Sequence, residues 1–131
     1  MSWFEVAPGA PFGTEELPYG IITTEDSDVR RVGVAIGDQV LDLARMAHAA
    51  GLEGEVFQQA TLNPLMSLGP DAWAEARQLL QALLEEDSGR EIVEPHLVPA
   101  ESVRLHLPID VADYVDFYAS EHHATNVGKI F

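Results

Sequence analysis

The sequence predicts a small α+β domain that is mainly β, built from short strands with one or two helices. Two observations carry this prediction. Residues 31–36 alternate between two kinds of side chain, and a Gly37-Asp38 pair then leads into the run 39–42, which is a typical hairpin signal. Residues 70–86, in contrast, repeat their apolar positions at helical spacing. No internal repeat or low-complexity tract is present.

The first third of the chain reads as turns followed by strands. Residues 1–20 are rich in proline and glycine, so we expect extended segments anchored by Trp3 and Phe4. A β-like run covers 19–24, and an acidic turn covers 25–28. One face of the hairpin that follows carries only small residues, so we expect something to pack closely over it; those residues are Gly33 and Ala35.

The middle of the chain reads as helices. We expect a helix over 41–50 that ends at Gly51. Asn63 before Pro64 has the pattern of an N-cap followed by proline in the first turn, opening a short helix that stops at Gly69. The 70–86 helix should bury an apolar stripe consisting of Trp73, Ala76, Leu80, Leu83 and Leu84.

Residues 87–99 read as a polar connection with two prolines, in which Gly89 ends the preceding helix. A strand is expected over 102–107, with its apolar residues inward and its polar residues toward solvent. The inward set is Val103, Leu105 and Leu107. We place a domain boundary at Pro108, so the domains are 1–108 and 109–131, with a helix expected over 120–131.

Composition limits the partners of this chain. Asp and Glu number 22 against 7 Lys and Arg, which gives a formal net charge of −15 and argues against nucleic acid and anionic membranes as partners. The absence of cysteine excludes disulfides and zinc–thiolate sites and favours the cytoplasm. We find neither a secretory signal pattern nor an apolar run that could span a membrane.

The most reactive stretch is DYVDFYASEHHATNVGKIF, at 113–131. In an extended chain Tyr114, Asp116 and Tyr118 share one face, which places a carboxylate beside a phenol. A carboxylate suits Ca²⁺ or Mg²⁺, and a phenol can bind a substrate oxygen. On spacing alone an acidic, solvated turn explains these residues too, since one carboxylate cannot hold a metal by itself.

His122 and His123 are neighbours that would point about 100° apart on a helix. One of them could therefore face a site as a general base while the other faces solvent. Two exposed histidines fit the spacing equally well. His48, His96 and His106 show no metal-ligand spacing and read as surface or core-edge residues.

The pattern D-Y-x-D-F-Y followed by H-A-T-N-V-G resembles the start of the catalytic domain of the fumarylacetoacetase family. Earlier blocks resemble its N-terminal domain in the same order, and together they cover essentially the whole chain. They are LPYGIITT at 17–24, RVGVAIGDQVLDL at 31–43, TLNPLMSLGPDAWAEAR at 61–77 and HLP at 106–108.

The resemblance implies a small SH3-like barrel as the N-terminal domain, followed by the first segment of a β-rich catalytic domain. It implies a homodimeric enzyme that hydrolyses a carbon–carbon bond of the small-molecule substrate fumarylacetoacetate, giving fumarate and acetoacetate in tyrosine breakdown. It also implies Ca²⁺ or Mg²⁺ as the cofactor.

By the same resemblance, Asp116 matches a metal-ligating carboxylate, Tyr118 a substrate-binding tyrosine, and His123 the base that activates water. His122 occupies a position that the family does not need as histidine. The family supplies its other ligands further along, so we expect this chain to be the front part of such an enzyme and inactive alone. The alternative is a stand-alone acidic SH3-like module for binding or oligomerisation.

Overall fold

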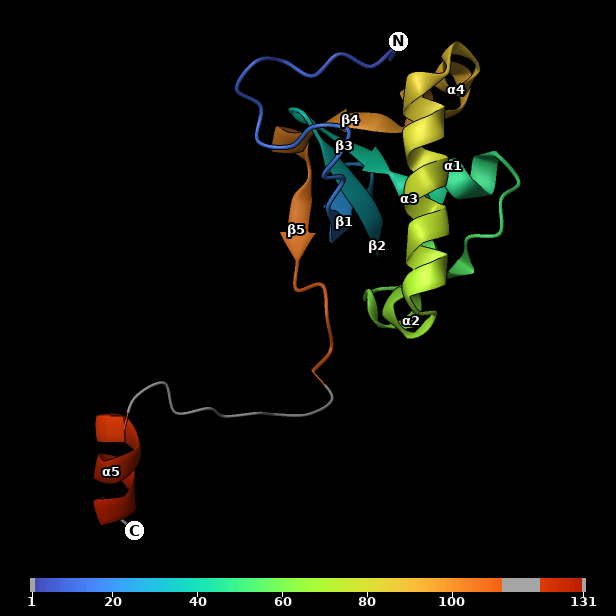
Figure 1. Cartoon of the computed structure of the whole chain (residues 1–131). Coiled ribbons are helices and arrows are strands. Elements are labelled where there is room, and N and C mark those ends of the chain that lie inside the picture. Colours follow the sequence, from blue (N-terminus) through green and yellow to red (C-terminus); the bar gives the residue numbers. More distant parts are fainter. Residues whose placement is uncertain (1, 112–120, 131) are drawn as a thin grey trace.

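The computed structural model describes residues 2–111 and 121–130 (Figure 1). It shows the mixed helix–strand class that the sequence predicts. The strands are β1 Tyr19–Thr24, β2 Ser27–Ile36, β3 Gln39–Asp42, β4 Leu97–Pro99 and β5 Arg104–His106. The α-helices are α1 Leu43–Ala49, α2 Asn63–Ser67, α3 Pro70–Glu85, α4 Asp87–Val93 and α5 Glu121–Ile130. Short 3₁₀ helices are η1 Glu55–Gln58, η2 Glu94–His96 and η3 Ala100–Ser102. The expectation of a mainly β fold with one or two helices was wrong: α3 alone spans 16 residues, whereas β4 and β5 span 3 residues each.

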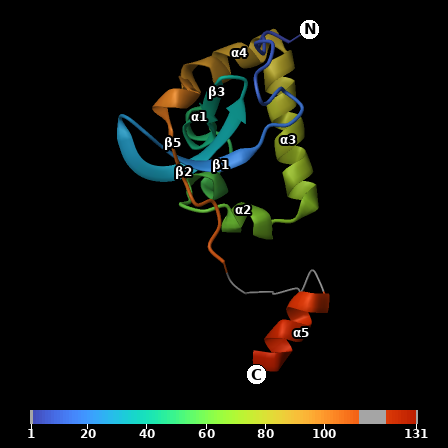
Figure 2. The same cartoon turned by 90° about the vertical axis from the view of Figure 1, so that its left-hand side faces the viewer.

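The five strands form one antiparallel sheet in the order β4-β3-β2-β1-β5. The two edge strands are consecutive in the chain, with η3 between them. In a flat sheet these edges would lie about 19 Å apart, at about 4.8 Å per strand spacing. The link from Pro99 to Arg104 spans at most about 17 Å when fully extended, and a 3₁₀ turn shortens it further. The sheet must therefore curl, and β2 is visibly bent (Figure 2).

The core lies between one face of this sheet and α3. Alternate residues of β2 point to this face and are buried, as expected: Val32, Val34 and Ile36. From α3 come Leu80 and Leu84, with 3% and 2% of their surface exposed. Phe4 is buried in the same cluster, and the Trp3 indole N–H donates to the Leu83 carbonyl at 2.7 Å. The N-terminal anchors are thus confirmed.

The small residues of the β-hairpin are explained by the side chains that pack on its opposite face. A Cβ placed on Gly33 would lie 2.9 Å from Ile22 Cδ1 and 3.1 Å from Val40 Cγ1. Side chains of the two flanking strands therefore pack over Gly33 from both sides. The close packing that the sequence predicts is real, and it comes from within the sheet.

Several boundaries agree closely with the sequence analysis. The strand expected over 19–24 and the one over 39–42 occur with those limits, and α3 ends one residue before the predicted position. β2 begins at Ser27, which is earlier than expected, so the acidic turn is shorter. The buried stripe of α3 is narrower than predicted. Leu83 is only partly buried and Trp73 is exposed, because its indole turns toward α2 and donates to the Leu65 carbonyl at 2.8 Å.

The polar connection expected over 87–99 was wrong. It contains α4, η2 and β4, and Gly89 lies within α4. A Cβ on Gly89 would clash with the Leu83 carbonyl group. Glycine is needed here because α4 crosses directly over the backbone of α3, and a sequence pattern cannot reveal such a contact. Val93 then enters the core with none of its surface exposed.

The orientation predicted for β5 was also wrong. Leu105 and Leu107 are 73% and 84% exposed. His106 points to the other face, where its ring nitrogen Nε2 lies 2.9 Å from the Thr23 hydroxyl. The alternation is present, but the face that carries the leucines is not covered by any described part of the chain.

The described residues do not form the closed barrel implied by the resemblance, since β4 and β5 are not paired with each other in them. The helix expected over 120–131 is confirmed as α5, which we describe by itself. Within the described residues no helix is long and apolar enough to cross a membrane.

Candidate functional site

Of the three predicted site residues, the structure describes only His123, and of that residue only the backbone. Asp116 and Tyr118 lie outside the described residues, as does Tyr114. His123 lies in the first turn of α5, and its side chain is not described. The neighbouring His122 is exposed to solvent.

Among the side chains that the structure describes, no group of three or more His, Asp or Glu residues could hold a metal ion. The predicted ligand, Asp116, lies outside this part of the chain.

The segment that leads toward Asp116 is attached to the domain by three hydrogen bonds. The Leu62 amide donates to the Pro108 carbonyl at 2.7 Å. The side chain of Asn63 donates from Nδ2 to the Asp110 carbonyl at 2.9 Å, and its Oδ1 accepts from the Asp110 amide at 3.0 Å. The Asn63 amide therefore pairs with both backbone groups of one residue, as a strand neighbour would.

This contact corrects the prediction for Asn63. The residue is the first of α2, the N-cap position falls on Leu62, and no side chain caps the helix. The side chain is occupied by Asp110 instead. A cap pattern specifies only local partners, so the sequence could not reveal a bond across 47 positions.

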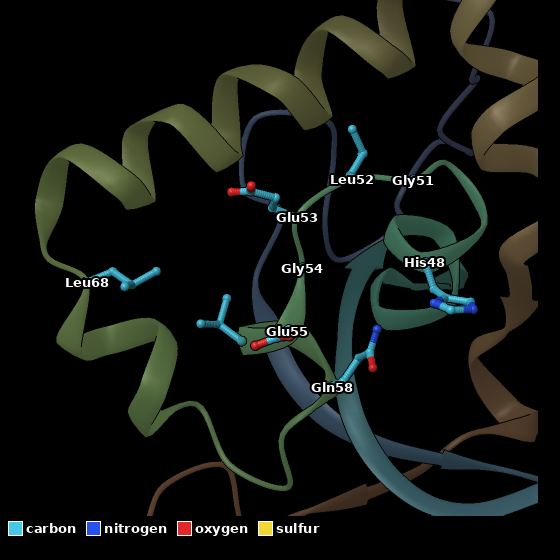
Figure 3. Close-up of a pocket in the computed structure, with 9 residues that line it drawn as sticks. His48, Gly51, Leu52, Glu53, Gly54, Glu55, Gln58 and Leu68 are labelled. Carbon is cyan, nitrogen blue, oxygen red and sulfur yellow. The ribbon is translucent and has the colours of Figure 1, made fainter.

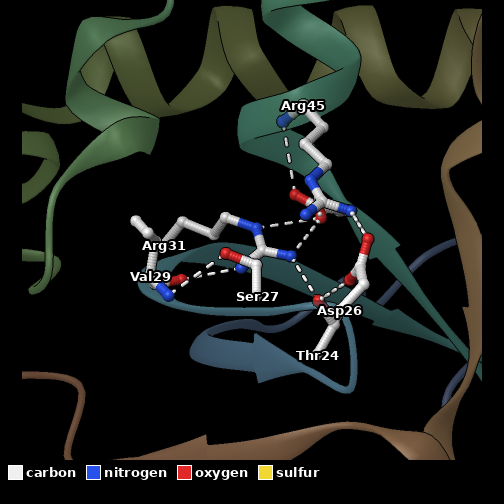
Figure 4. Close-up of polar contacts among 7 residues, drawn as sticks. Thr24, Asp26, Ser27, Val29, Arg31 and Arg45 are labelled. Atoms are coloured by element: carbon white, nitrogen blue, oxygen red, sulfur yellow. Dashed lines mark hydrogen bonds and ion pairs between the residues drawn. The ribbon is translucent and has the colours of Figure 1, made fainter.

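A buried ion pair fixes the start of α1 against β2 (Figure 4). Arg31 donates from Nε and Nη2 to Asp42 Oδ2 at 2.9 and 2.8 Å, and both side chains are almost fully buried. The other carboxylate oxygen of Asp42 accepts from the Arg45 amide at 3.2 Å and so caps α1. Every buried side-chain nitrogen or oxygen in the described residues has a partner. This network is satisfied internally, which indicates a structural role.

A cavity of about 750 Å³ surrounds the loop between α1 and η1 (Figure 3). Its polar side chains do not converge. His48 and Gln58 lie on one side of the loop, whereas Glu53 points to the other side. Catalytic chemistry needs acid, base and binding groups directed at one point, so this cavity is a weak candidate for a reaction site.

One histidine of the described domain has a shifted pKa. Partial desolvation lowers the pKa of His106, and the positive charges of Arg30 and Arg104 lower it further. Its ring nitrogen Nε2 lies 2.9 Å from the Thr23 hydroxyl. His106 is therefore a core-edge residue, as the sequence analysis proposed.

Comparison with known proteins decides what the domain is. The model of the fumarylacetoacetase N-terminal family matches residues 15–108, which include all five strands. The chain belongs to the fumarylacetoacetase family. Among curated fumarylacetoacetases, those of Mus musculus and Homo sapiens are each 42% identical to it over 141 aligned residues, and that of Caenorhabditis elegans is 41% identical over 140.

The alignments to the mouse and human fumarylacetoacetases cover all of this chain and 34% of each relative. The C. elegans alignment covers 99% of this chain and 34% of that relative. The chain thus spans about a third of the length of the fumarylacetoacetases that it matches. The similarity extends beyond the matched N-terminal domain and takes in residues 109–131.

Proposed function

We propose that this chain is the N-terminal part of a fumarylacetoacetase, an enzyme that hydrolyses a carbon–carbon bond of fumarylacetoacetate to give fumarate and acetoacetate. The observation that carries the proposal is the alignment of the entire chain, at 42% identity, with proteins of that name. In this proposal residues 1–108 are the first domain and 109–131 begin the catalytic domain.

Three residues are assigned roles by their match to the family pattern. Asp116 would be one ligand of the divalent ion, and Tyr118 would hydrogen-bond a substrate oxygen. His123 would take a proton from the attacking water, for which an imidazole of near-neutral pKa is suited. Its place in the first turn of a helix gives its backbone a regular conformation.

The donor chemistry fits a hard cation. A carboxylate oxygen is the ligand type that Ca²⁺ and Mg²⁺ prefer, and the ion would supply charge stabilisation for the enolate that leaves. Asp116 offers at most two of the roughly six to eight oxygens that Ca²⁺ takes. The remaining ligands would come from further residues of the proposed enzyme, in the part that corresponds to the other two thirds of the relatives.

Two further features belong to the same proposal. An SH3-like barrel is supported by the strand order, in which the consecutive edge strands β4 and β5 are joined by one 3₁₀ turn. Homodimer formation is proposed from the family resemblance. A cytoplasmic location is proposed from the lack of cysteine. Sedimentation analysis would test the dimer.

The decisive experiment compares two adjacent histidines in the full natural protein that contains this sequence. His123→Ala should abolish hydrolysis of fumarylacetoacetate with little change in thermal stability. His122→Ala is the matched control, since it lies on the same helix and is exposed, and it should retain activity. Wild-type protein that leaves fumarylacetoacetate intact, or equal effects of both substitutions, would refute the proposal.

A further inference from the structure

The two hydrogen bonds between the Asn63 side chain and the Asp110 backbone form a tether. This tether begins in a firmly held part of the domain. Leu65 of α2 is buried, and its carbonyl accepts the Trp73 indole N–H from α3 at 2.8 Å. α3 in turn contributes the buried Leu80 and Leu84 to the core. Asn63 therefore projects from a helix whose position is set by the core, and it can transmit that position to whatever it binds.

The partner of Asn63 lies just before the catalytic segment. Asp110 is six positions ahead of Asp116, and β5 ends at His106, four positions earlier still. The Leu62 amide already holds Pro108, eight positions before Asp116. Without the bonds of Asn63 the chain from Pro108 to Asp116 could extend about 27 Å, whereas from Asp110 it can extend only about 20 Å. Anchoring at Asp110 thus restricts the volume in which the proposed metal ligand is found by roughly twofold, by the cube of these reaches.

Both bonds of the tether are made by one side-chain amide. Among side chains, only those of Asn and Gln carry an NH₂ donor and a carbonyl acceptor on the same carbon. The bonds are exposed to solvent, so they add little to the stability of the fold, since water can replace them. Their effect is to fix direction, because the paired amide sets the path of the backbone at Asp110.

We infer that Asn63 is a positioning residue of the proposed enzyme, which holds the backbone at Asp110 so that Asp116 and the segment after it enter the active site in one orientation. This inference rests on the proposed function. It predicts that loss of the amide damages turnover more than folding, because small displacements of catalytic groups cost much rate.

The test uses the full natural protein with three variants. Asn63→Ala removes both bonds. Asn63→Asp keeps the acceptor and loses the donor, and as an anion in the first turn it suits the helix dipole. Ser67→Ala is the matched control, since Ser67 lies in α2 and its exposed hydroxyl donates to the Pro64 carbonyl of the same helix. Hydrogen exchange of the Asp110 amide, thermal unfolding, kcat and KM for fumarylacetoacetate are measured for each.

For Asn63→Ala we expect exchange at Asp110 to accelerate roughly fivefold or more and kcat to fall roughly 10- to 100-fold, with unchanged thermal stability and a smaller change in KM. Asn63→Asp should also lose kcat, whereas a residue that merely supported α2 would be rescued by it. Ser67→Ala should match the wild type. If Asn63→Ala does not fold, Asn63→Asp carries the same test.

Two results would overturn the inference while the proposed function stands: an unchanged kcat in the Asn63 variants of an active enzyme, or unchanged exchange at Asp110. A full natural protein that does not hydrolyse fumarylacetoacetate would instead refute the proposed function, and the positioning role with it. The exchange measurement needs neither metal nor substrate, so the two failures are distinguished.

Discussion

At the residue scale, the most consequential interaction is the ion pair between Arg31 and Asp42. Arg31 forms two bonds to one carboxylate oxygen and a third, from Nη1 to the Val29 carbonyl at 2.7 Å. Two charges that leave water together are tolerated when their bonds are satisfied, and removing one leaves the other stranded. The pair joins β2 to the start of α1 and so fixes the corner between them.

Arg31→Ala should therefore lower the free energy of unfolding by about 3–5 kcal/mol, because the Asp42 carboxylate stays buried without its partner. Arg45→Ala is the control. Arg45 pairs with Asp26, and its Nε also lies 3.5 Å from Asp42 Oδ2, but its side chain is 42% exposed, so its loss should cost about 1 kcal/mol or less. Urea unfolding measures both. Equal losses for the two variants would contradict a special role for the buried pair.

The exposed carboxyl of Asp26 gives a pH dependence. The Thr24 hydroxyl donates to it, and Arg45 adds a hydrogen bond and positive charge, which together lower the pKa of Asp26 from 3.8 to about 2. In the range between these values the unfolded chain holds more protons than the folded one. The contribution to stability is therefore present above about pH 4 and is lost as the pH falls through about 2.

This shift is measurable by following the Asp26 carboxyl resonance through an acid titration. In Thr24→Val the titration midpoint should move upward, toward the ordinary value of an aspartate, because the hydrogen bond from the Thr24 hydroxyl, the largest cause of the lowered pKa, is removed. An unchanged midpoint would show that the hydroxyl does not hold the carboxylate.

At the element scale, the contact between α3 and α4 depends on one absent side chain. The backbone of Leu83 occupies the space that a Cβ at position 89 would need. Gly89→Ala should therefore destabilise the domain by about 1–3 kcal/mol or more, since two helix backbones must separate.

Gly128→Ala is a fitting control for this substitution. Gly128 is also helical, but among the described parts of the chain a Cβ there meets nothing within 4 Å. Alanine should be neutral there or favour the helix by up to about 1 kcal/mol. Thermal unfolding distinguishes the two substitutions, and a harmless Gly89→Ala would mean that α4 can move away from α3 freely.

At the scale of the whole molecule, the described domain provides the support and the 109–131 segment provides the proposed chemistry. We expect the 131-residue chain alone to show neither tight Ca²⁺ binding nor turnover of fumarylacetoacetate, because Asp116 supplies at most two oxygens where about six to eight are needed. Calorimetry and a substrate-depletion assay test this. Micromolar affinity for Ca²⁺ or steady turnover would show that the segment forms a site without further ligands.

The sequence by itself determined the parts of this protein whose signals are local. Alternation predicted the buried face of β2, and helical spacing predicted α3. The roles of Asp116, Tyr118 and His123 come from the resemblance of a continuous motif to the family, and they stay predictions. Each signal depends on neighbours within a few residues, where the geometry of strands and helices is regular.

Only the tertiary structure decided the contacts between distant segments. In the folded chain α4 packs over the backbone at Leu83, and Leu105 is exposed to solvent. Asn63 binds the backbone of Asp110, where the sequence predicted a helix cap. Asn63 has several possible hydrogen-bond partners, and the one that it binds is the backbone that the folded chain brings within about 3 Å of it. Whether the positions of Gly89 and Leu105 are covered or exposed depends likewise on which distant segment the fold brings against them, and no local pattern encodes that.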